Sequence, residues 1–264
     1  MRKGSKVINI LFFIESLSGG GAEKVLRNLV NAMDQTKFCI TVQTLYPDDA
    51  GKYLAPGIRY RYCYPAKNRI NELRMRAEAA AGLTYPLRIK GDYDIEVAYL
   101  ECGSTKIMAS STNQKALKLA WVHCDLAKKA DNPAAFARES AKYYQKFDKV
   151  VCVSEDVHRS FQEMYGPIAE TAIVYNCYDD AEILHKAEKQ VPAKEERTIV
   201  AIGRLTAQKG FDRLLRVHKR LIDEGIRYQL KILGEGEDRK ALEAFVEQND
   251  LTDTVTLCGF QENP

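Results

Sequence analysis

Long hydrophobic runs are the clearest absence from this sequence. Hydrophobic residues make up 45% of the 264 residues, yet no apolar stretch approaches the roughly 20 residues that a membrane-spanning helix needs. The basic start at residues 1–6 precedes only a short apolar segment with the character of a strand, so we expect no secretory signal. The net charge is only +3. Because no known nucleic-acid-binding motif accompanies the basic residues, we do not expect nucleic acid as a partner.

Paired cysteines and clustered metal ligands are also missing. The seven cysteines are scattered and form no CxxC pair, and the four histidines show no ligand spacing with each other or with cysteine. We therefore expect no metal and no other cofactor. Most of the cysteines fall in strand-like apolar runs, so we expect small buried side chains in a reducing compartment. The expected location is the cytoplasm.

Apolar strand-like runs alternate with helical patterns along the whole chain, which is typical of parallel α/β sheets. The expected strands are 7–14, 38–45, 94–100, 117–122, 149–153, 171–175, 198–202, 228–233 and 254–258. The expected helices are 22–34, 69–81, 133–146, 155–164, 210–224 and 237–248.

A polar, lysine- and glutamate-rich stretch at 185–197 has the composition of a linker or an exposed helix. We therefore predict two Rossmann-like parallel-sheet domains, at 1–190 and 191–264. The second has only about 70 residues, whereas a complete domain of this class usually has about 100–150. It is accordingly expected to be incomplete, with an unpaired sheet edge and an uncovered apolar face.

The most informative segment is IVAIGRLTAQKG at 199–210. A short apolar strand ends in Gly203 and Arg204, and Lys209 then opens an amphipathic helix. Ligands of doubly wound domains bind at the carboxyl edge of the sheet. Because arginine offers a planar pair of donors and lysine a compact ammonium, the two cations suit a diphosphate. The alternative is a pair of solvated cations beside an ordinary turn.

A second glycine-rich turn follows the first strand, in VINILFFIESLSGGGAEKV. Three glycines before a helix allow backbone N–H groups to approach an anion without a Cβ in the way. The segment is not a P-loop, because no Gly-Lys-Ser/Thr follows, and it is not a convincing GxGxxG fingerprint. A tight turn of purely steric origin remains the alternative.

Together these segments resemble the family 4 glycosyltransferases, which are retaining enzymes of the GT-B fold. The resemblance lies in SGGGAEKV (18–25), WVHCDL (121–126), VVCVSE (150–155), VYN (174–176), AIGRLTAQKGFDRLL (201–215) and LKILGEGEDRKALE (230–243). It implies hexosyl transfer from a nucleoside-diphosphate sugar to a glycan or lipid-linked acceptor in cell-surface polysaccharide synthesis. Retaining transfer in this family is thought to need no enzyme nucleophile.

The resemblance also implies roles for single residues, each with a structural alternative. His123 would contact the donor sugar or the reacting centre. The residues expected to bind the donor are Gly20, Gly21, Arg204, Lys209, Gly234 and Gly236. Further candidates for the cleft are Glu101, Ser154 and Asn176; a capping role for Glu101 is equally consistent with its place after a strand.

One departure from the family concerns the glutamate pair that holds the donor sugar and its ribose, because no segment here matches it. We therefore expect a fragment that is catalytically inactive on its own. The alternative function is a nucleotide-sugar or phosphosugar binding module without transfer activity.

Residues 59–90 contain eight lysines and arginines against two glutamates, a local net charge of +6, with tyrosines interleaved. This composition favours contact with anionic lipid headgroups, at about 1 kcal/mol per cation near the surface, so the protein is expected to be peripheral on the inner face of the membrane. A solvated charged face is the alternative.

Overall fold

The computed structural model describes residues 6–189 and 197–261, which form two compact units that divide between Asp179 and Asp180. The division falls earlier in the chain than the predicted boundary at 190/191, because helix α8 (Asp180–Lys189) is grouped with the C-terminal unit. Residues 190–196 of the predicted linker lie outside the described residues.

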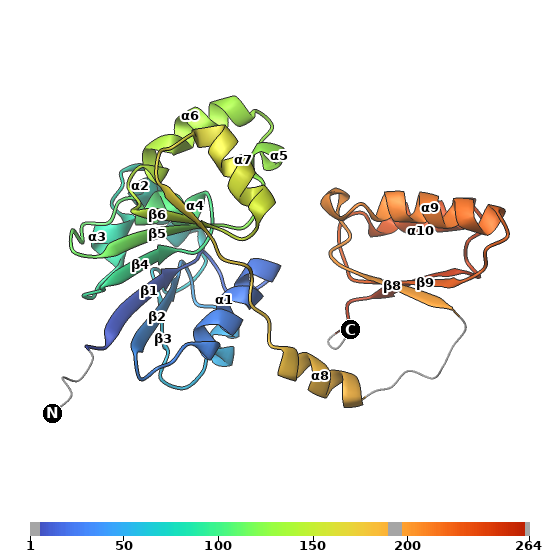
Figure 1. Cartoon of the computed structure of the whole chain (residues 1–264), viewed down its shortest axis with the longest axis horizontal. Coiled ribbons are helices and arrows are strands. Elements are labelled where there is room, and N and C mark those ends of the chain that lie inside the picture. Colours follow the sequence, from blue (N-terminus) through green and yellow to red (C-terminus); the bar gives the residue numbers. More distant parts are fainter. Residues whose placement is uncertain (1–5, 190–196, 262–264) are drawn as a thin grey trace. The chain divides into compact units, whose positions relative to one another are not determined.

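The N-terminal unit contains a seven-stranded parallel sheet in the order β3-β2-β1-β4-β5-β6-β7 (Figure 1). Its strands are β1 (Ile8–Phe13), β2 (Phe38–Thr44), β3 (Arg59–Tyr62), β4 (Ile95–Ala98), β5 (Leu117–Val122), β6 (Lys149–Cys152) and β7 (Glu170–Ile173). The strand order reverses between β1 and β4, and ligands of such sheets bind outside the carboxyl ends of the strands at that point.

Helices cover both faces of this sheet. They are α1 (Gly21–Ala32), η1 (Asp49–Tyr53), α2 (Arg69–Ala80), α3 (Thr84–Arg88), α4 (Gly103–Met108), α5 (Leu126–Lys129), α6 (Pro133–Tyr144) and α7 (Glu155–Tyr165). Successive residues of a strand point to opposite faces. Ile10 and Phe12 of β1 accordingly share a core with α1, whereas Leu11 and Phe13 share one with α6 and α7. Because both faces are buried, residues 10–13 of the strand are all apolar rather than alternating.

The C-terminal unit contains a smaller parallel sheet in the order β10-β9-β8. Its elements are β8 (Thr198–Ile202), η2 (Ala207–Lys209), α9 (Phe211–Asp223), β9 (Gln229–Leu233), α10 (Arg239–Gln248) and β10 (Val255–Gly259). Helices α9 and α10 lie on the same face of this sheet (Figure 1). On β8, Val200 and Ile202 are exposed, so the expected uncovered apolar surface is present among the described residues.

The prediction of an α/β fold with two parallel sheets is therefore confirmed, with additions. Strand β3 was not predicted, because its sequence RYRY is largely exposed and carries no apolar pattern. The short helices α3, α4 and α5 were not predicted either, since four to six residues are too few for a periodic stripe. Within the described ranges, no helix combines the length and the hydrophobicity needed to span a bilayer.

Candidate functional site

The predicted donor-binding cations lie in the loop that follows β8. Arg204 comes two residues after the strand ends, and Lys209 closes the short helix η2 before α9 begins. Both side chains are exposed, and neither has an ion-pair partner among the described residues. Two unpaired cations thus stand at the carboxyl edge of the C-terminal sheet, where an anionic ligand can reach them.

The loops after β8 and β9 pack directly against each other, and this contact depends on two glycines. The Leu205 N–H donates to the Glu235 carbonyl at 2.9 Å. A Cβ on Gly234, whose φ is +141°, would lie 1.9 Å from the Gly203 carbonyl oxygen, and a Cβ on Gly236 would lie 2.2 Å from the Leu205 carbonyl oxygen. Gly234 and Gly236 therefore hold the loop that carries Arg204 in place; nucleotide contact by these two glycines stays a prediction.

Alanine at either glycine should destabilise the C-terminal unit. Gly236→Ala introduces only the backbone clash, at an expected cost of about 1–3 kcal/mol in the free energy of unfolding, and Gly234→Ala adds strain from its positive φ. Gly225→Ala is the matched control, because its φ of +83° is strained but a Cβ there meets nothing within 4 Å. Urea unfolding compares the three variants. A loss in Gly234→Ala no larger than in Gly225→Ala would contradict the packing role.

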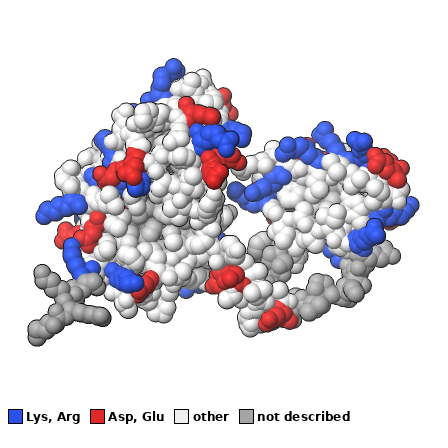
Figure 2. Space-filling model, viewed as in Figure 1, with Lys and Arg blue, Asp and Glu red and all other residues white. Residues whose placement is uncertain are grey.

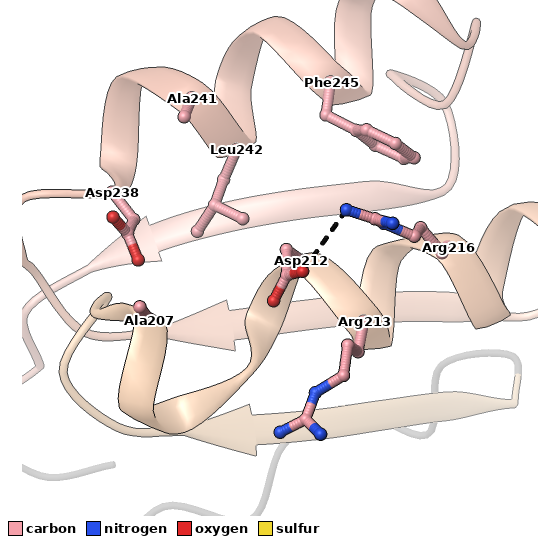
Figure 3. Close-up of a pocket in the computed structure, with 8 residues that line it drawn as sticks. All are labelled: Ala207, Asp212, Arg213, Arg216, Asp238, Ala241, Leu242 and Phe245. Atoms are coloured by element: carbon pink, nitrogen blue, oxygen red, sulfur yellow. Dashed lines mark hydrogen bonds and ion pairs between the residues drawn. The ribbon is translucent and has the colours of Figure 1, made fainter. Parts of the chain in front are cut away.

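A pocket of about 520 Å³ lies beside η2, between the first turns of α9 and α10 (Figure 3). Its charges are balanced, because Asp212 and Asp238 line it together with Arg213 and Arg216, and Asp212 pairs with Arg216 at 3.4 Å. Neither Arg204 nor Lys209 lines this pocket. The pocket is therefore not the predicted diphosphate site.

In the N-terminal unit, a buried carboxylate marks the point where the strand order reverses. Glu101, which follows β4 closely, is only 4% exposed. It accepts hydrogen bonds from the His123 backbone N–H at 3.1 Å and the Cys124 thiol at 3.0 Å, and its Oε1 lies 3.1 Å from Lys129 Nζ. Burial opposes ionisation, but these donors and the lysine charge leave the pKa of Glu101 below its ordinary value. Its carboxylate thereby ties β4 to the segment after β5.

Glu15, which the sequence analysis did not single out, lies on the other side of this switch point. It follows β1 closely, and its carboxylate lies beside the backbone of Gly103 and Ser104 at the start of α4. A Cβ on Gly103 would lie 2.0 Å from Glu15 Oε1. Glu15 remains exposed as a residue, but partial burial of its carboxyl group against α4 raises the pKa of Glu15. Two carboxylates of unlike pKa thus flank the carboxyl ends of β1 and β4.

His123, the predicted catalytic residue, follows β5 directly and stands at the same sheet edge. Its ring packs against Tyr99, with 4.8 Å between ring centroids, and stacks with Trp121 at 6.5 Å. Burial lowers the pKa of His123, so the imidazole is neutral at neutral pH. Its Nε2 is buried and has no hydrogen-bond partner among the described residues. One nitrogen of the neutral ring is thus buried without a hydrogen-bond partner in the described part of the chain.

The glycine-rich loop before α1 is held by Asp48. This carboxylate accepts hydrogen bonds from Ser16 Oγ at 2.7 Å, from Ser18 Oγ and from the Leu17 N–H at 2.9 Å. Burial of Asp48 works against the charge, but these bonds and one from the Ala50 N–H lower the pKa of Asp48 to about 2. Asp48 is separated from the loop by some 30 residues of sequence, which is why its role was not predicted.

The two predicted glycines of this loop differ. A Cβ on Gly20 would lie 2.2 Å from a carboxylate oxygen of Glu23, whereas a Cβ on Gly21 would meet nothing within 4 Å. Glu23 thus covers the start of α1 at Gly20, where an anion was expected to approach. Gly21→Ala has no steric cost and is suited to testing a ligand contact there.

The Asp48 anchor predicts a pH dependence of stability. Because the folded pKa of about 2 is below the ordinary 3.8, the stabilisation is complete above pH 4 and is lost as the pH falls from about 4 towards 2. The shift corresponds to about 2 kcal/mol. The free energies of unfolding of the native protein and of Asp48→Asn, measured with urea, should therefore differ by about this amount at pH 6 and become nearly equal near pH 2. A constant difference across this range would contradict the assignment.

Of the remaining candidates, Ser154 caps α7, with its Oγ accepting from the Val157 N–H at 3.2 Å. Asn176 is exposed in the segment after β7.

Among the residues the structure describes, no three His, Cys, Asp or Glu side chains are grouped so that they could hold a metal ion. The sheet edge of the N-terminal unit thus brings together Glu15, Glu101 and His123.

Comparisons with known proteins bear on the family and the fold. Residues 183–264 match the model of the family described as glycosyl transferases group 1. An uncharacterized glycosyltransferase of Methanocaldococcus jannaschii is 30% identical over 132 residues, covering 47% of this chain and 32% of its own length. An N-acetylgalactosamine-N,N'-diacetylbacillosaminyl-diphospho-undecaprenol 4-alpha-N-acetylgalactosaminyltransferase of Campylobacter jejuni is 35% identical over 92 residues, covering 35% of this chain and 24% of its own length.

Among solved structures, HepE from Anabaena, crystallised with UDP and glucose, superposes with a TM-score of 0.67 at 15% identity over 97% of this chain and 70% of that protein. This likeness confirms the predicted GT-B fold class. The predicted resemblance to glycosyltransferases is confirmed by the family model, which covers the C-terminal unit. The chain matches about a third or less of the length of the two curated relatives.

Proposed function

We propose that this chain carries the donor-binding and acceptor-side elements of a retaining nucleotide-sugar glycosyltransferase of family 4. The single observation that carries the proposal is the loop after β8. It lies in the segment that matches glycosyl transferases group 1, and it presents Arg204 and Lys209 without ion-pair partners among the described residues. A diphosphate leaving group gains negative charge as the glycosidic bond breaks, and preorganised cations stabilise that charge.

The proposed acceptor is a glycan or a lipid-linked sugar of a cell-surface polysaccharide. The Campylobacter jejuni relative is named for transfer to a diphospho-undecaprenol-linked acceptor, which supports this class. His123, with a neutral ring and an unpartnered Nε2 among the described residues, is proposed to meet a donor-sugar hydroxyl. No metal is assigned a role.

The test is release of nucleoside diphosphate from a panel of nucleotide sugars, with and without glycan and lipid-linked acceptors. Acceptor-dependent release of one nucleotide is the expected result. Binding of a nucleotide sugar without release in any acceptor mixture would instead support a binding module. Retention is checked by NMR of the anomeric proton in the product.

We further propose that residues 1–264 alone turn over donor poorly. The three strands of the C-terminal unit have helices on one face only, and apolar residues of β8 are exposed. Electrostatic catalysis requires rigidly held groups. The purified chain is compared with a longer product of the same gene, if the reading frame continues. Equal turnover would refute this part of the proposal.

A peripheral membrane contact is proposed for α2. Ile70 and Leu73 are 76% and 59% exposed, and they lie on one helix with exposed Arg69 and Arg76. An interfacial helix joins apolar and basic side chains in this way. On the face of the N-terminal unit shown in Figure 2, basic and acidic side chains are interspersed. The proposal therefore rests on the combination of side chains on α2 and not on charge alone.

Not all the cations of 59–90 are available to lipid. Arg88 is paired with Glu78, and Arg61 donates to the Lys90 carbonyl. Arg74 also pairs with Glu78, at 3.9 Å. Arg69→Glu with Arg76→Glu should therefore abolish co-sedimentation with vesicles containing phosphatidylserine, while nucleotide binding is unchanged. Ile70→Ser with Leu73→Ser should weaken sedimentation even at high salt, where the Debye length falls to about 3 Å. If the native protein does not co-sediment with these vesicles at low salt, the proposal is wrong.

A further inference from the structure

Two adjoining cavities form a groove on the N-terminal unit that none of the predicted site residues explains. Their volumes are about 390 and 250 Å³, and they lie among α4, α5 and α6. Cys102, Phe136 and Glu139 line both cavities, so the two adjoin and are together called the groove. Cys102 directly follows Glu101 in the chain, and Lys129, which is paired with Glu101, also lines the groove.

The residue where the cavities meet has an unusual backbone. Cys102 has a φ of +65°, which is uncommon for a residue with a side chain, and backbone strain of this kind clusters at functional sites. It is also the only one of the seven cysteines that is exposed. Only Cys63 and Cys152 are buried, so the expectation of small buried side chains, drawn from the strand-like runs in which most of the cysteines fall, is wrong for five of the seven.

The smaller cavity, of about 250 Å³, has aromatic walls and an unsatisfied hydroxyl. Phe136, Tyr143 and Tyr144 line it. Tyr144 is only 1% exposed, and its hydroxyl has no hydrogen-bond partner within the described part of the chain. The Thr105 hydroxyl, which lies near the Tyr144 hydroxyl, donates to the Leu100 carbonyl at 2.9 Å. A buried hydroxyl without a partner is costly, so a polar ligand atom would gain from reaching it.

The same cavity holds an unpaired cation. Lys106 is half-buried in its lining and has no ion-pair partner among the described residues. Lys129, which lines the larger cavity of about 390 Å³, is paired with Glu101 at 3.1 Å. The carboxylates of Asp131 and Glu139 belong to exposed residues of the lining. Lys106 is therefore the cation left for an anionic ligand.

We propose that this groove binds an amphipathic phosphate, in which a phosphate or diphosphate joins an apolar chain. The phosphate contacts Lys106 and the Tyr144 hydroxyl, and the first carbons of the chain pack against Phe136 and Tyr143. The Lys106 ammonium, which is unpaired among the described residues, favours the phosphate, although the exposed Asp131 and Glu139 carboxylates balance the total charge of the lining, and the aromatic walls favour the chain. The identification of this ligand as the acceptor rests on the proposed function, whereas its binding to the groove does not.

The probe is geranyl phosphate, kept below its micelle concentration, with geraniol and inorganic phosphate as the separate halves. Calorimetry should show binding of geranyl phosphate and at least tenfold weaker binding of each half. Lys106→Ala should weaken binding of geranyl phosphate at least tenfold, and Lys115→Ala, which removes an exposed lysine outside the groove, should not. Unchanged affinity in Lys106→Ala, or inorganic phosphate binding as tightly as geranyl phosphate, would overturn the proposal.

Tyr144→Phe separates ligand binding from folding. Because the hydroxyl has no partner among the described residues, its removal should leave the melting temperature unchanged or raise it, while affinity for geranyl phosphate falls severalfold. A lower melting temperature with unchanged affinity would instead show a structural hydroxyl and contradict the contact.

Alkylation of Cys102 gives an independent readout. Geranyl phosphate should slow iodoacetamide labelling of Cys102 but not of Cys177, as followed by peptide mass spectrometry; equal labelling rates with and without the probe would contradict the site. The groove and the proposed function fail separately, because nucleoside-diphosphate binding is measured on its own. Binding of geranyl phosphate without any binding of nucleotide would support the proposed groove ligand and contradict the proposed glycosyltransferase function.

Discussion

Replacing Arg204 or Lys209 by alanine is expected to weaken nucleoside-diphosphate binding by roughly tenfold to a hundredfold in each case. A charge-assisted contact contributes about 1.5–3 kcal/mol. Neither side chain has an ion-pair partner among the described residues, so the substitutions break no ion pair seen in the structure and should leave folding intact. Isothermal calorimetry with UDP, GDP and ADP measures the affinities, and thermal unfolding checks the fold.

Arg220→Ala is the matched control for these variants. It removes the same charge from the same unit, but Arg220 lies in the last turn of α9 and pairs with Glu224 at 3.0 Å. Its loss should leave nucleotide affinity unchanged, which separates a local contact from a change in overall charge. Unchanged nucleotide affinity in both Arg204→Ala and Lys209→Ala would contradict the assignment of the donor site to this loop.

Much of the fold could be predicted because buried strands and amphipathic helices leave strong local patterns. Strand 198–202 matches β8, and the apolar stripe of 210–224 matches α9 (Phe211–Asp223). The missed elements lack such patterns. Strand β3 is formed by pairing of exposed residues with β2, and α4 begins at Gly103 beneath the Glu15 carboxylate. Their formation depends on tertiary contacts that no short window of sequence contains.

The candidate site shows the same division. The loop with Arg204 is marked locally by glycine and by the helix that follows. The reason for Gly234 and Gly236 is a contact with another loop some 30 residues earlier in the chain, so sequence alone could not distinguish it from nucleotide contact. The anchoring role of Asp48 could not be predicted from a local pattern either, because its partners lie some 30 residues earlier in the chain. Glu15 follows an apolar strand just as Glu101 does, so the local pattern that predicts Glu101 also indicates Glu15.

His123→Ala is expected to reduce the rate of sugar transfer by roughly a hundredfold to a thousandfold in a transfer-competent form of the protein. Loss of one preorganised group that acts in the transition state typically has an effect of this size. Folding should change much less, because the His123 ring is only partly buried and its Nε2 has no partner among the described residues. Initial rates and melting temperatures of the same preparations give the comparison.

A second histidine provides the control for this prediction. His218 is fully buried, and its Nε2 lies 2.9 Å from Thr254 Oγ1. Burial lowers the pKa of both histidines, so they share a neutral ring and differ in whether Nε2 is paired. His218→Ala should therefore lower the melting temperature markedly, whereas His123→Ala should lower the transfer rate. If His123→Ala lost stability and activity in the proportion seen for His218→Ala, His123 would be a structural residue, because a group that acts only on bound sugar has no means of stabilising the free protein.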